Sequence, residues 1–550
     1  MIEWKKTRKR KEETRMWKRT AALLLCLLCC LPLLGGCAEQ EDDGTGKSFT
    51  WHLSSEPKTL DPQIAQGENA AIVIGALFEG LVRLDETGRA VPGAAESWEH
   101  SDDFLTWTFH LRSGATWSDG ETPVTADDFV FAFRRALDPA TGSETCGPLL
   151  CLENAEQVHA GEQDVTSLGV QAVDELTLTV RLAYPVQDFP VLTAQPVCMP
   201  CNEPFFNETA GRYCLDRSRL LGNGPFVIDG RYGWDAGRHI NLAASSTYWG
   251  EVAPSNVKLP IGKAEITVDD PAAAVSDGTV DAIAVTAAEA EKAEQAGCTI
   301  TTFEDGVWGF CFNLTSDLSP ELANEKVRQA FLRAADWAAL RGMLEDPAGG
   351  LVPPAVTLEG ETYREAAGSI TIPEKLEDAA ALMREGLAEI GAETPPEITI
   401  LCPDDPEITA LVNEILVAWN NAFGRYFNMD PLSEDELASR IAAGSFSAAI
   451  ACFTPAGNDP VSALTTFSMG NSANVCHFSD AAYDDLLEQA RRAGGSAKIS
   501  ACLSAEQYLA DKAVFLPVTY SSQYFAGAPG VSGFIFHPYG GGVDFTNARK

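Results

Sequence analysis

The sequence predicts an α/β protein built from two or three lobes. The chain has 550 residues, and a single hydrophobic core stops growing at roughly 250–300 residues. Short segments with alternating apolar residues, typical of strands, mix along the chain with longer segments of helical spacing. Neither an internal repeat nor a low-complexity stretch follows the polar tract at 39–46. A large globular protein with mixed secondary structure is therefore expected.

The first residues predict export from the cell. Residues 5–19 carry nine Lys and Arg, and the apolar run that follows covers 21–34. A helix needs about 20 apolar residues to cross a bilayer, so this run is too short to form a membrane-spanning helix. The basic and then apolar order is typical of a signal peptide, which we expect over residues 1–36. Met16 is an alternative start, because residues 16–37 alone form a complete short signal.

Cys37 directly follows small residues in Leu34-Gly35-Gly36-Cys37, which resembles a bacterial lipobox. Cleavage before such a cysteine leaves it to carry acyl chains. We therefore expect lipidation at Cys37, a tether over 37–47 and a body at the extracytoplasmic face of the cell membrane. The alternative is a signal peptide that contains an incidental cysteine.

The composition excludes one class of partner. The formal net charge is −38, and removal of the basic leader makes the body more acidic still. Such a charge repels nucleic acid and favours solubility. A diffuse negative field also attracts cationic ligands, although it is more often only a solvated exterior. The body is expected to be a monomer.

The cysteines do not predict a disulfide framework. Four of the 15 lie in the leader or at the anchor, which leaves the odd number of eleven. Cys198 and Cys201 have the spacing of a metal or redox pair, but no second such pair follows. We expect mostly free, buried thiols, no metal site and no cofactor.

The elements of the first half are predicted from alternation and caps. Strands are expected at 48–53, 106–111 and 177–182, and a helix leading into a strand at 70–84. Thr125 is a good N-cap with Asp127 and Asp128 in the first turn, where the helix dipole favours carboxylates. That helix should end before Asp138-Pro139. A turn at 221–226 should lead into a further strand.

The second half is expected to be an α/β lobe. An amphipathic helix over 326–344 would bury Val327, Ala330, Phe331 and Ala334. Strands are expected at 398–402 and 448–453. The further helices are expected at 376–390, 408–423, 433–443, 481–493 and 497–511.

A string over 106–130, Thr-Trp-Thr-Phe-His-Leu-Arg-Ser-Gly-Ala-Thr-Trp-Ser-Asp-Gly-Glu-Thr-Pro-Val-Thr-Ala-Asp-Asp-Phe-Val, resembles the signature of family 5 extracellular solute-binding proteins. These proteins serve peptide and nickel ABC importers. The resemblance runs from about Ser48 to Phe545. Other matching strings occur in the same order, at 60–62, 77–82, 136–139, 221–226, 248–249 and 327–330.

The resemblance implies a fold and a domain order. It implies a bilobed periplasmic-binding-protein-like α/β fold, type II, of the large cluster with an inserted third domain. Two lobes joined by hinge strands close around a ligand, and a membrane permease recognises the closed shape. Lobe I would take 48–90, 216–305 and 518–550. The inserted domain would take 91–215, and lobe II would take 306–517.

The resemblance also implies a ligand site. Oligopeptide binders of this family hold the free amine of the peptide with an Asp in a Trp-Cys/Ile-Ala-Asp-Tyr-x-Asp/Glu-Pro stretch. The corresponding stretch here is Phe453-Thr454-Pro455-Ala456-Gly457-Asn458-Asp459-Pro460, which places Ala456 at the position of that Asp. The expected ligand-binding residues are Gln66, Gly67, Glu68, Trp308, Phe310, Phe453, Thr454, Ala456, Asn458 and Tyr520.

Ala456 leaves two hypotheses open. A buried ammonium without a counter-charge costs several kcal/mol. Either the ligand has no free α-amine, which we favour, or Asp459 or Glu68 supplies the charge. For the aromatic residues of this set, ordinary core packing is the competing interpretation, above all for Phe310.

The motifs of enzymes are missing from the sequence. The seven His include no i, i+4 pair and no HExxH, and no GxSxG, P-loop or dinucleotide fingerprint occurs. Acidic doublets lie at turns and helix starts, where capping explains them. We expect a binding protein that delivers peptide-like solutes to an ABC permease and its ATPase subunits. The alternatives are a nickel-chelate, haem or sugar binder, and a cell-surface hydrolase.

Overall fold

The computed structural model describes residues 46–550, apart from 359, 456, 472 and 540–541. The expected signal peptide and Cys37 therefore lie outside the described residues, as does Ala456. A five-stranded sheet comes first in the order β1-β11-β10-β8, and β9 pairs with β10. Its strands are β1 (Ser48–Thr50), β8 (Phe226–Ile228), β9 (Trp234–Asp235), β10 (His239–Ala244) and β11 (Asn256–Pro260).

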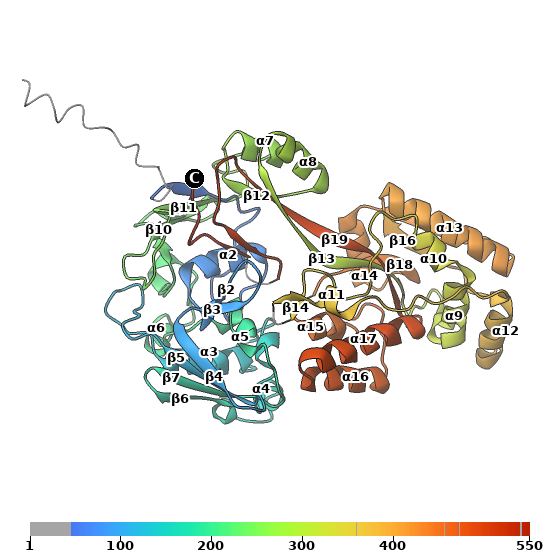
Figure 1. The fold of residues 1–550 in the computed structure, drawn as a ribbon, viewed down its shortest axis with the longest axis horizontal. Coiled ribbons are helices and arrows are strands. Elements are labelled where there is room, and N and C mark those ends of the chain that lie inside the picture. Colours follow the sequence, from blue (N-terminus) through green and yellow to red (C-terminus); the bar gives the residue numbers. More distant parts are fainter. Residues whose placement is uncertain (1–45, 359, 456, 472, 540–541) are drawn as a thin grey trace, which may run out of the picture. The chain divides into compact units, whose positions relative to one another are not determined.

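Helix α2 (Glu68–Leu77) packs on β8 and on the C-terminal hairpin. It is followed by a strand at Val82–Leu84, so the helix and strand predicted over 70–84 are confirmed, and that strand forms a hairpin that was not predicted. The C-terminal residues thus return to the N-terminal part of the fold (Figure 1). The two hairpins are β2 (Val82–Leu84) with β3 (Ala90–Pro92), and β20 (Ile535–His537) with β21 (Gly542–Asp544).

A four-stranded antiparallel sheet has the order β4-β5-β7-β6. Helix α3 (Ala126–Leu137) packs on its strands β6 and β7. Thr125 is its N-cap, and the Asp128 carboxylate accepts a hydrogen bond from the Thr125 amide at 2.8 Å, so the predicted cap is confirmed. The remaining elements here are β4 (Ala95–His100), β5 (Thr106–Leu111), β6 (Val170–Asp174), β7 (Thr177–Arg181), α4 (Ala155–His159), α5 (Phe189–Leu192) and α6 (Glu203–Glu208).

A six-stranded mixed sheet, in the order β12-β19-β13-β18-β16-β17, occupies the second half. Its strands are β12 (Ala282–Val285), β13 (Thr299–Phe312), β16 (Thr399–Pro403), β17 (Asn428–Leu432), β18 (Ala448–Phe453) and β19 (Phe515–Gly527). Because side chains alternate across a strand, Phe310 and Ile450 face one core, while Cys311 and Ala449 face the other.

Helices cover both faces of this sheet. The first core contains residues of α9 (Glu325–Ala334), α10 (Trp337–Arg341), α12 (Ala379–Ile390) and α13 (Pro406–Phe423). The second contains residues of α11 (Tyr363–Ala367), α14 (Glu434–Ala442), α15 (Pro460–Thr465), α16 (Ala481–Arg492) and α17 (Gly495–Asp511). Figure 1 shows α13 on one side of the sheet and α17 on the other. A small hairpin, β14 (Thr357–Leu358) with β15 (Glu361–Thr362), precedes α11.

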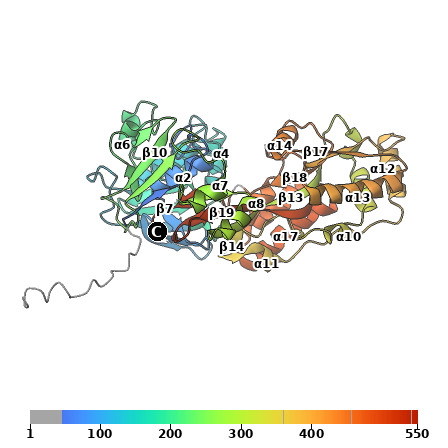
Figure 2. The same ribbon diagram turned by 90° about the horizontal axis from the view of Figure 1, so that it is seen from above.

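Two long strands, β13 and β19, connect the parts of the fold, and we call them the linking strands. They pair antiparallel from Thr299 with Gly527 to Cys311 with Phe515. At one end β12 pairs with β19, and at the other end β18 pairs with β13. In the chain, α7 (Pro271–Ser276) precedes β12 and α8 (Ala287–Gln295) follows it. Figure 2 shows β13 and β19 running together from α7 and α8 toward β18.

One helix predicted from the sequence is divided into two helices in the structure. The expected helix over 326–344 ends as α9 at Ala334, because Ala335 is extended with φ −93° and ψ 152°. Asp336 then caps α10, since its carboxylate accepts from the Ala339 amide at 3.1 Å. The residues predicted to be buried are nevertheless buried, on α9.

The eleven cysteines of the described chain are unpaired, and all but Cys452 are buried. This agrees with the expectation of free thiols. Within the described residues, no helix is long and apolar enough to cross a membrane. In that same part of the chain, no group of three or more His, Cys, Asp or Glu is arranged to hold a metal ion.

Candidate ligand-binding site

A pocket of about 940 Å³ lies between residues 144–195 and the six-stranded sheet with its helices. One wall comes from the loops around the four-stranded sheet. The other comes from β13, β18, α14 and the loop after β18. This volume is in the range of sites that bury most of a small ligand. The first wall includes Glu144, Pro148, Tyr184, Val186, Leu192 and Gln195.

Four residues predicted from the sequence line this pocket, namely Trp308, Phe453, Thr454 and Asn458. Trp308 lies on β13, and Phe453 ends the neighbouring strand β18. The Asn458 amide is held in place by Thr357, because its Oδ1 accepts from the Thr357 amide at 2.8 Å and its Nδ2 donates to the Thr357 hydroxyl at 2.9 Å. The pocket therefore combines aromatic surface with fixed polar groups.

Of the other predicted residues, those that the structure describes are not in the lining of this pocket. Phe310 is 1% exposed and packs against Trp337 and Trp419 in the core. The pairing of β13 with β19 shifts by one residue between Trp308 and Gly309. Phe310 and Trp308 therefore point in different directions, although they are two residues apart on one strand. The Tyr520 hydroxyl instead accepts a hydrogen bond from the Gly349 amide at 2.9 Å.

Gln66, Gly67 and Glu68 lie together at the start of α2 and are exposed. Gly67 has φ 86°, a backbone conformation that favours glycine. Although solvent reaches Glu68, protein surrounds its carboxyl closely enough that desolvation raises its pKa. None of these three residues is in the lining of the pocket.

Lys498 was not predicted as a site residue, and it forms part of the pocket. Its side chain is 9% exposed, and its ammonium lies 2.6 Å from a carboxylate oxygen of Asp459. Burial alone would lower the pKa of Lys498, but Asp459 outweighs this and raises it. The Asp459 carboxylate also accepts from the Ser462 amide as the N-cap of α15. Asp459 is therefore already neutralised by a cation of the protein.

Cys452 is the exposed thiol of the described chain, and it faces the pocket beside Thr454 and Ser521. Burial of the sulfur by surrounding protein raises the pKa of this thiol to about 11. The thiol is thus protonated at neutral pH and acts as a small neutral surface. Gly306 packs against the same corner, because a Cβ there would lie 3.3 Å from the Cys452 Sγ.

A hydrogen bond crosses from one wall to the other. The Gln187 Oε1 accepts from the Gly495 amide at 2.9 Å, at the N-terminus of α17. Gly494, the N-cap of α17, has no side chain that could cap the helix. A Cβ at Gly494 would lie 2.5 Å from the Gln187 Cδ, so only glycine leaves room for this contact.

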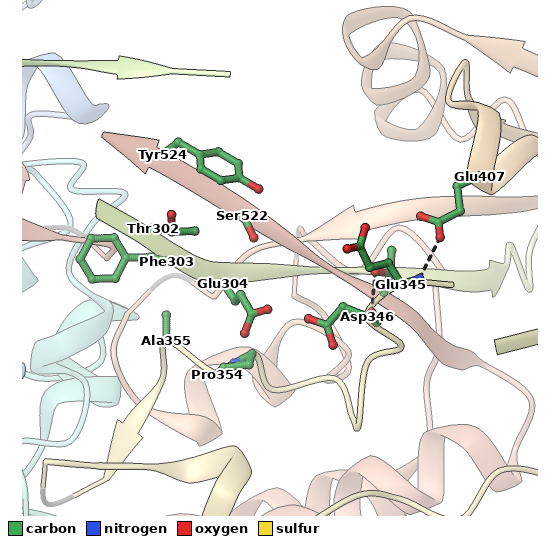
Figure 3. Close-up of a pocket in the computed structure, with 11 residues that line it drawn as sticks. Thr302, Phe303, Glu304, Glu345, Asp346, Pro354, Ala355, Glu407, Ser522 and Tyr524 are labelled. Carbon is green, nitrogen blue, oxygen red and sulfur yellow. Dashed lines mark hydrogen bonds between the residues drawn. The ribbon is translucent and has the colours of Figure 1, made fainter. Parts of the chain in front are cut away.

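A second cavity, of about 700 Å³, lies beside the linking strands (Figure 3). Glu304 on β13 points toward Asp346, and Glu345 and Glu407 lie further along the same cavity. Burial and a hydrogen bond with Asp346 raise the pKa of Glu304 to about 7. This acidic cavity contains none of the residues predicted for ligand binding.

Comparisons with known proteins agree with this fold. Residues 89–474 match the profile of the bacterial extracellular solute-binding proteins, family 5 Middle. The chain is 28% identical over 499 residues to the dipeptide-binding protein DppE of Bacillus subtilis, covering 88% of this chain and 89% of DppE. It is 30% identical over 502 residues to the probable deoxycholate-binding periplasmic protein YgiS of Escherichia coli, covering 89% and 91%.

A solved structure gives the same result. The substrate-binding domain of an oligopeptide ABC transporter from Bacillus anthracis superposes with a TM-score of 0.69 at 26% identity, over 92% of this chain and 99% of that one. The bilobed α/β fold implied by the sequence is confirmed. Members of this family bind solutes and are not enzymes, which rules out the cell-surface hydrolase. The matched profile and the full-length similarity show that this chain belongs to family 5 of the bacterial extracellular solute-binding proteins.

Proposed function

We propose that this protein is the lipid-anchored substrate-binding component of an ABC importer, that it captures peptide-like solutes by closure of its lobes, and that it delivers them to a membrane permease. The pocket of about 940 Å³ is the observation that carries this proposal, since aromatic side chains and fixed polar groups line it from two sides. Relatives named as dipeptide-binding and oligopeptide-binding support the peptide ligand.

The domain boundaries that we propose are those expected from the sequence. Lobe I takes 48–90, 216–305 and 518–550, the inserted domain 91–215, and lobe II 306–517. The sheets support this division, because the five-stranded sheet falls within lobe I and the four-stranded sheet within the inserted domain. In the six-stranded sheet, β16, β17 and β18 fall within lobe II, β12 within lobe I, and β13 and β19 run from one lobe into the other. The linking strands then serve as the hinge.

Closure of the lobes is supported by the contact between Gln187 and Gly495. Gln187 belongs to the proposed inserted domain and Gly495 to lobe II, so their hydrogen bond joins the two sides of the pocket. Asp188, the next residue, contributes to the raised pKa of Lys498 on α17. Gln187 and Asp188 thus both interact with the N-terminal part of α17.

The ligand stays open between two classes. A relative named as a probable deoxycholate-binding protein shows 30% identity, so a solute without an α-amine is the second candidate. Nickel chelates, haem and sugars remain further alternatives within binding. We propose peptides first, because several relatives are named for peptides.

Native mass spectrometry of the processed protein, extracted from membranes in detergent, tests this function. A retained mass that fragments as a peptide would support it and would show whether the amine is free or blocked. A retained bile acid, or an empty protein that no peptide of a random tetrapeptide mixture stabilises against heat, would contradict the peptide ligand.

A further inference from the structure

Arg491 is a cation of the large pocket that has no close partner. Lys498 and Arg491 are the cationic residues in the described lining of this pocket. The Lys498 ammonium lies 2.6 Å from the Asp459 carboxylate and is therefore neutralised. The Arg491 guanidinium instead lies 3.4 Å from the Thr465 hydroxyl and 3.7 Å from the Glu488 carboxylate. Charge-assisted hydrogen bonds measure about 2.7–2.9 Å, so neither contact fills the donors of this guanidinium.

Glu488 does not neutralise Arg491, because it already binds Arg492. The Arg492 Nε donates to the Glu488 carboxylate at 2.6 Å, and a second nitrogen of the same guanidinium lies 2.5 Å from it. One carboxylate thus serves two guanidiniums near the C-terminus of α16, and Arg492 is the closer of the two. A positive charge therefore remains at the wall of the pocket.

Three helices hold Arg491 in place. α16 packs against α15 and α17, on one side of the six-stranded sheet (Figure 1). The Thr465 hydroxyl on α15, which accepts the hydrogen bond from Arg491, donates in turn to the Val461 carbonyl oxygen at 2.7 Å. The guanidinium is therefore fixed on the side of α15. A guanidinium carries five N–H groups, so its other donors remain available to a group inside the pocket.

Three hydroxyls of the same lining also lack a partner. Ser462 lies on α15, Thr466 directly follows that helix, and Tyr184 comes from the opposite wall. None of these hydroxyls forms a hydrogen bond with another group of the described chain. Together with Arg491, the pocket thus presents donors that an acceptor of the ligand can fill. A carboxylate suits them, because its two oxygens only accept.

The acidic residues of the lining leave the charge of Arg491 in place. Three of them are exposed, so water and salt screen their charges. The other two act on Lys498 and raise its pKa. The exposed residues are Glu144, Glu156 and Glu434, and those that act on Lys498 are Asp188 and Asp459. A ligand anion in this pocket therefore finds its counter-charge in Arg491.

We propose that Arg491 binds a carboxylate of the captured solute. This assignment rests on the proposed function, and it narrows the ligand to solutes that join a carboxylate to an apolar body. Peptides with a free C-terminus and bile acids share this chemistry. The planar guanidinium donates two parallel hydrogen bonds to one carboxylate. The apolar body packs on apolar side chains of the same lining, namely Trp308, Leu437, Ile441, Phe453 and Val461.

Equilibrium dialysis with mass-spectrometric detection tests the assignment. The probes are a random tetrapeptide mixture with free C-termini, the same mixture with amidated C-termini, and deoxycholate. Wild-type protein should retain the free mixture more strongly than the amidated one. Arg491→Gln should lower retention of the free mixture by about tenfold to hundredfold, the range for loss of a charge-assisted hydrogen bond, and should leave the amidated mixture unchanged. Arg491→Lys should lose less, because it keeps the charge without the planar fork.

Two further variants separate this role from a structural one. Glu488→Gln removes the carboxylate that competes for Arg491, so it should raise retention of the free mixture by up to about fivefold. Arg440→Gln is the matched control, and it should equal wild type. Arg440 lies on α14, which lines the same pocket, but its own side chain is outside the lining and is paired with Asp430 at 2.6 Å.

The outcomes distinguish the assignment from the proposed function. Equal retention of every carboxylate probe by Arg491→Gln and wild type would overturn the assignment and leave the function intact. An equal loss for the free and amidated mixtures, or the same loss with Arg440→Gln, would also overturn it. Retention of deoxycholate alone, weakened by Arg491→Gln, would support the assignment and contradict the peptide ligand. Retention of no probe by wild type would overturn the assignment and the peptide ligand together.

Discussion

The Lys498 ammonium lies 2.6 Å from the Asp459 carboxylate at the edge of the large pocket, with 9% of the lysine side chain and 25% of the aspartate side chain exposed. The sequence suggested Asp459 as a possible partner for a ligand amine. The lysine changes that interpretation, because it supplies the counter-charge from within the protein. The pair fixes the N-terminus of α15 against the first turn of α17.

Lys498→Met should destabilise the protein by up to about 3 kcal/mol, since removal of one partner leaves a partly buried charge unpaired. Lys498→Met combined with Asp459→Asn should recover part of that loss. Urea unfolding of the two single variants and the double variant measures the coupling. Additive losses would show that the two side chains do not interact.

Gln187→Ala should weaken ligand binding by about fivefold, in line with the loss of a helix cap of about 1 kcal/mol. Gln187→Glu should strengthen binding at low ionic strength, because a carboxylate suits the N-terminus of a helix. Titration calorimetry with a retained ligand measures both effects. Gln171→Glu is the control, since Gln171 is an exposed glutamine of β6.

Gly494→Ala provides an independent test of the same contact. The added Cβ would displace the Gln187 amide, so this variant should bind as weakly as Gln187→Ala. The double variant should be no weaker than either single variant. A further loss of affinity in the double variant would mean that Gln187 and Gly494 act separately.

Glu304 should make stability depend on pH. Its pKa is raised from 4.5 to about 7 in the folded protein, so the folded state binds a proton more tightly than the unfolded state. The stabilisation of the folded state by the protonated Glu304 carboxyl is fully present below about pH 4.5 and is lost as the pH rises through about 7. Glu304→Gln should therefore raise the melting temperature relative to wild type above pH 7, but not at pH 4. Solvent screens this partly exposed pair, so the gain is on the order of 1 kcal/mol or less. An equal difference at both pH values would contradict this explanation.

Cys37→Ala should move the protein from the membrane fraction to the soluble extracytoplasmic fraction. Lipidation needs the thiol at this position, and the short apolar segment cannot replace an anchor once it is cleaved. Cell fractionation with immunodetection checks this expectation, with Cys30→Ala as the control. A Cys37→Ala protein that stayed in the membrane would count against the lipid anchor.

Local elements were largely predictable from the sequence because local chemistry determines them. Thr125 and Asp128 predicted the start of α3, and the alternation of apolar and polar residues predicted β5 and β7. The break at Ala335 was missed, since Val327 to Leu344 has continuous helical spacing and only the cap at Asp336 interrupts it. Asp336 before the apolar residues of α10 was the signal in the sequence that could have predicted the start of a new helix.

The site was only partly predictable. Trp308, Phe453, Thr454 and Asn458 came from the family resemblance, and they line one pocket. The opposite wall, the pairing of Lys498 and the position of Arg491 against α15 depend on contacts between residues far apart in the chain. No periodicity or spacing in a single sequence encodes such pairings, and Arg491 reads as one basic residue among many.

Small-angle X-ray scattering of the Cys37→Ala chain, with and without a saturating peptide identified by native mass spectrometry, tests the central claim most directly. Peptide capture by lobe closure predicts a smaller radius of gyration with the peptide bound, and recovery of the peptide uncleaved. Binding without any change in the radius of gyration would contradict closure. Recovery of cleaved peptide would contradict a binding protein.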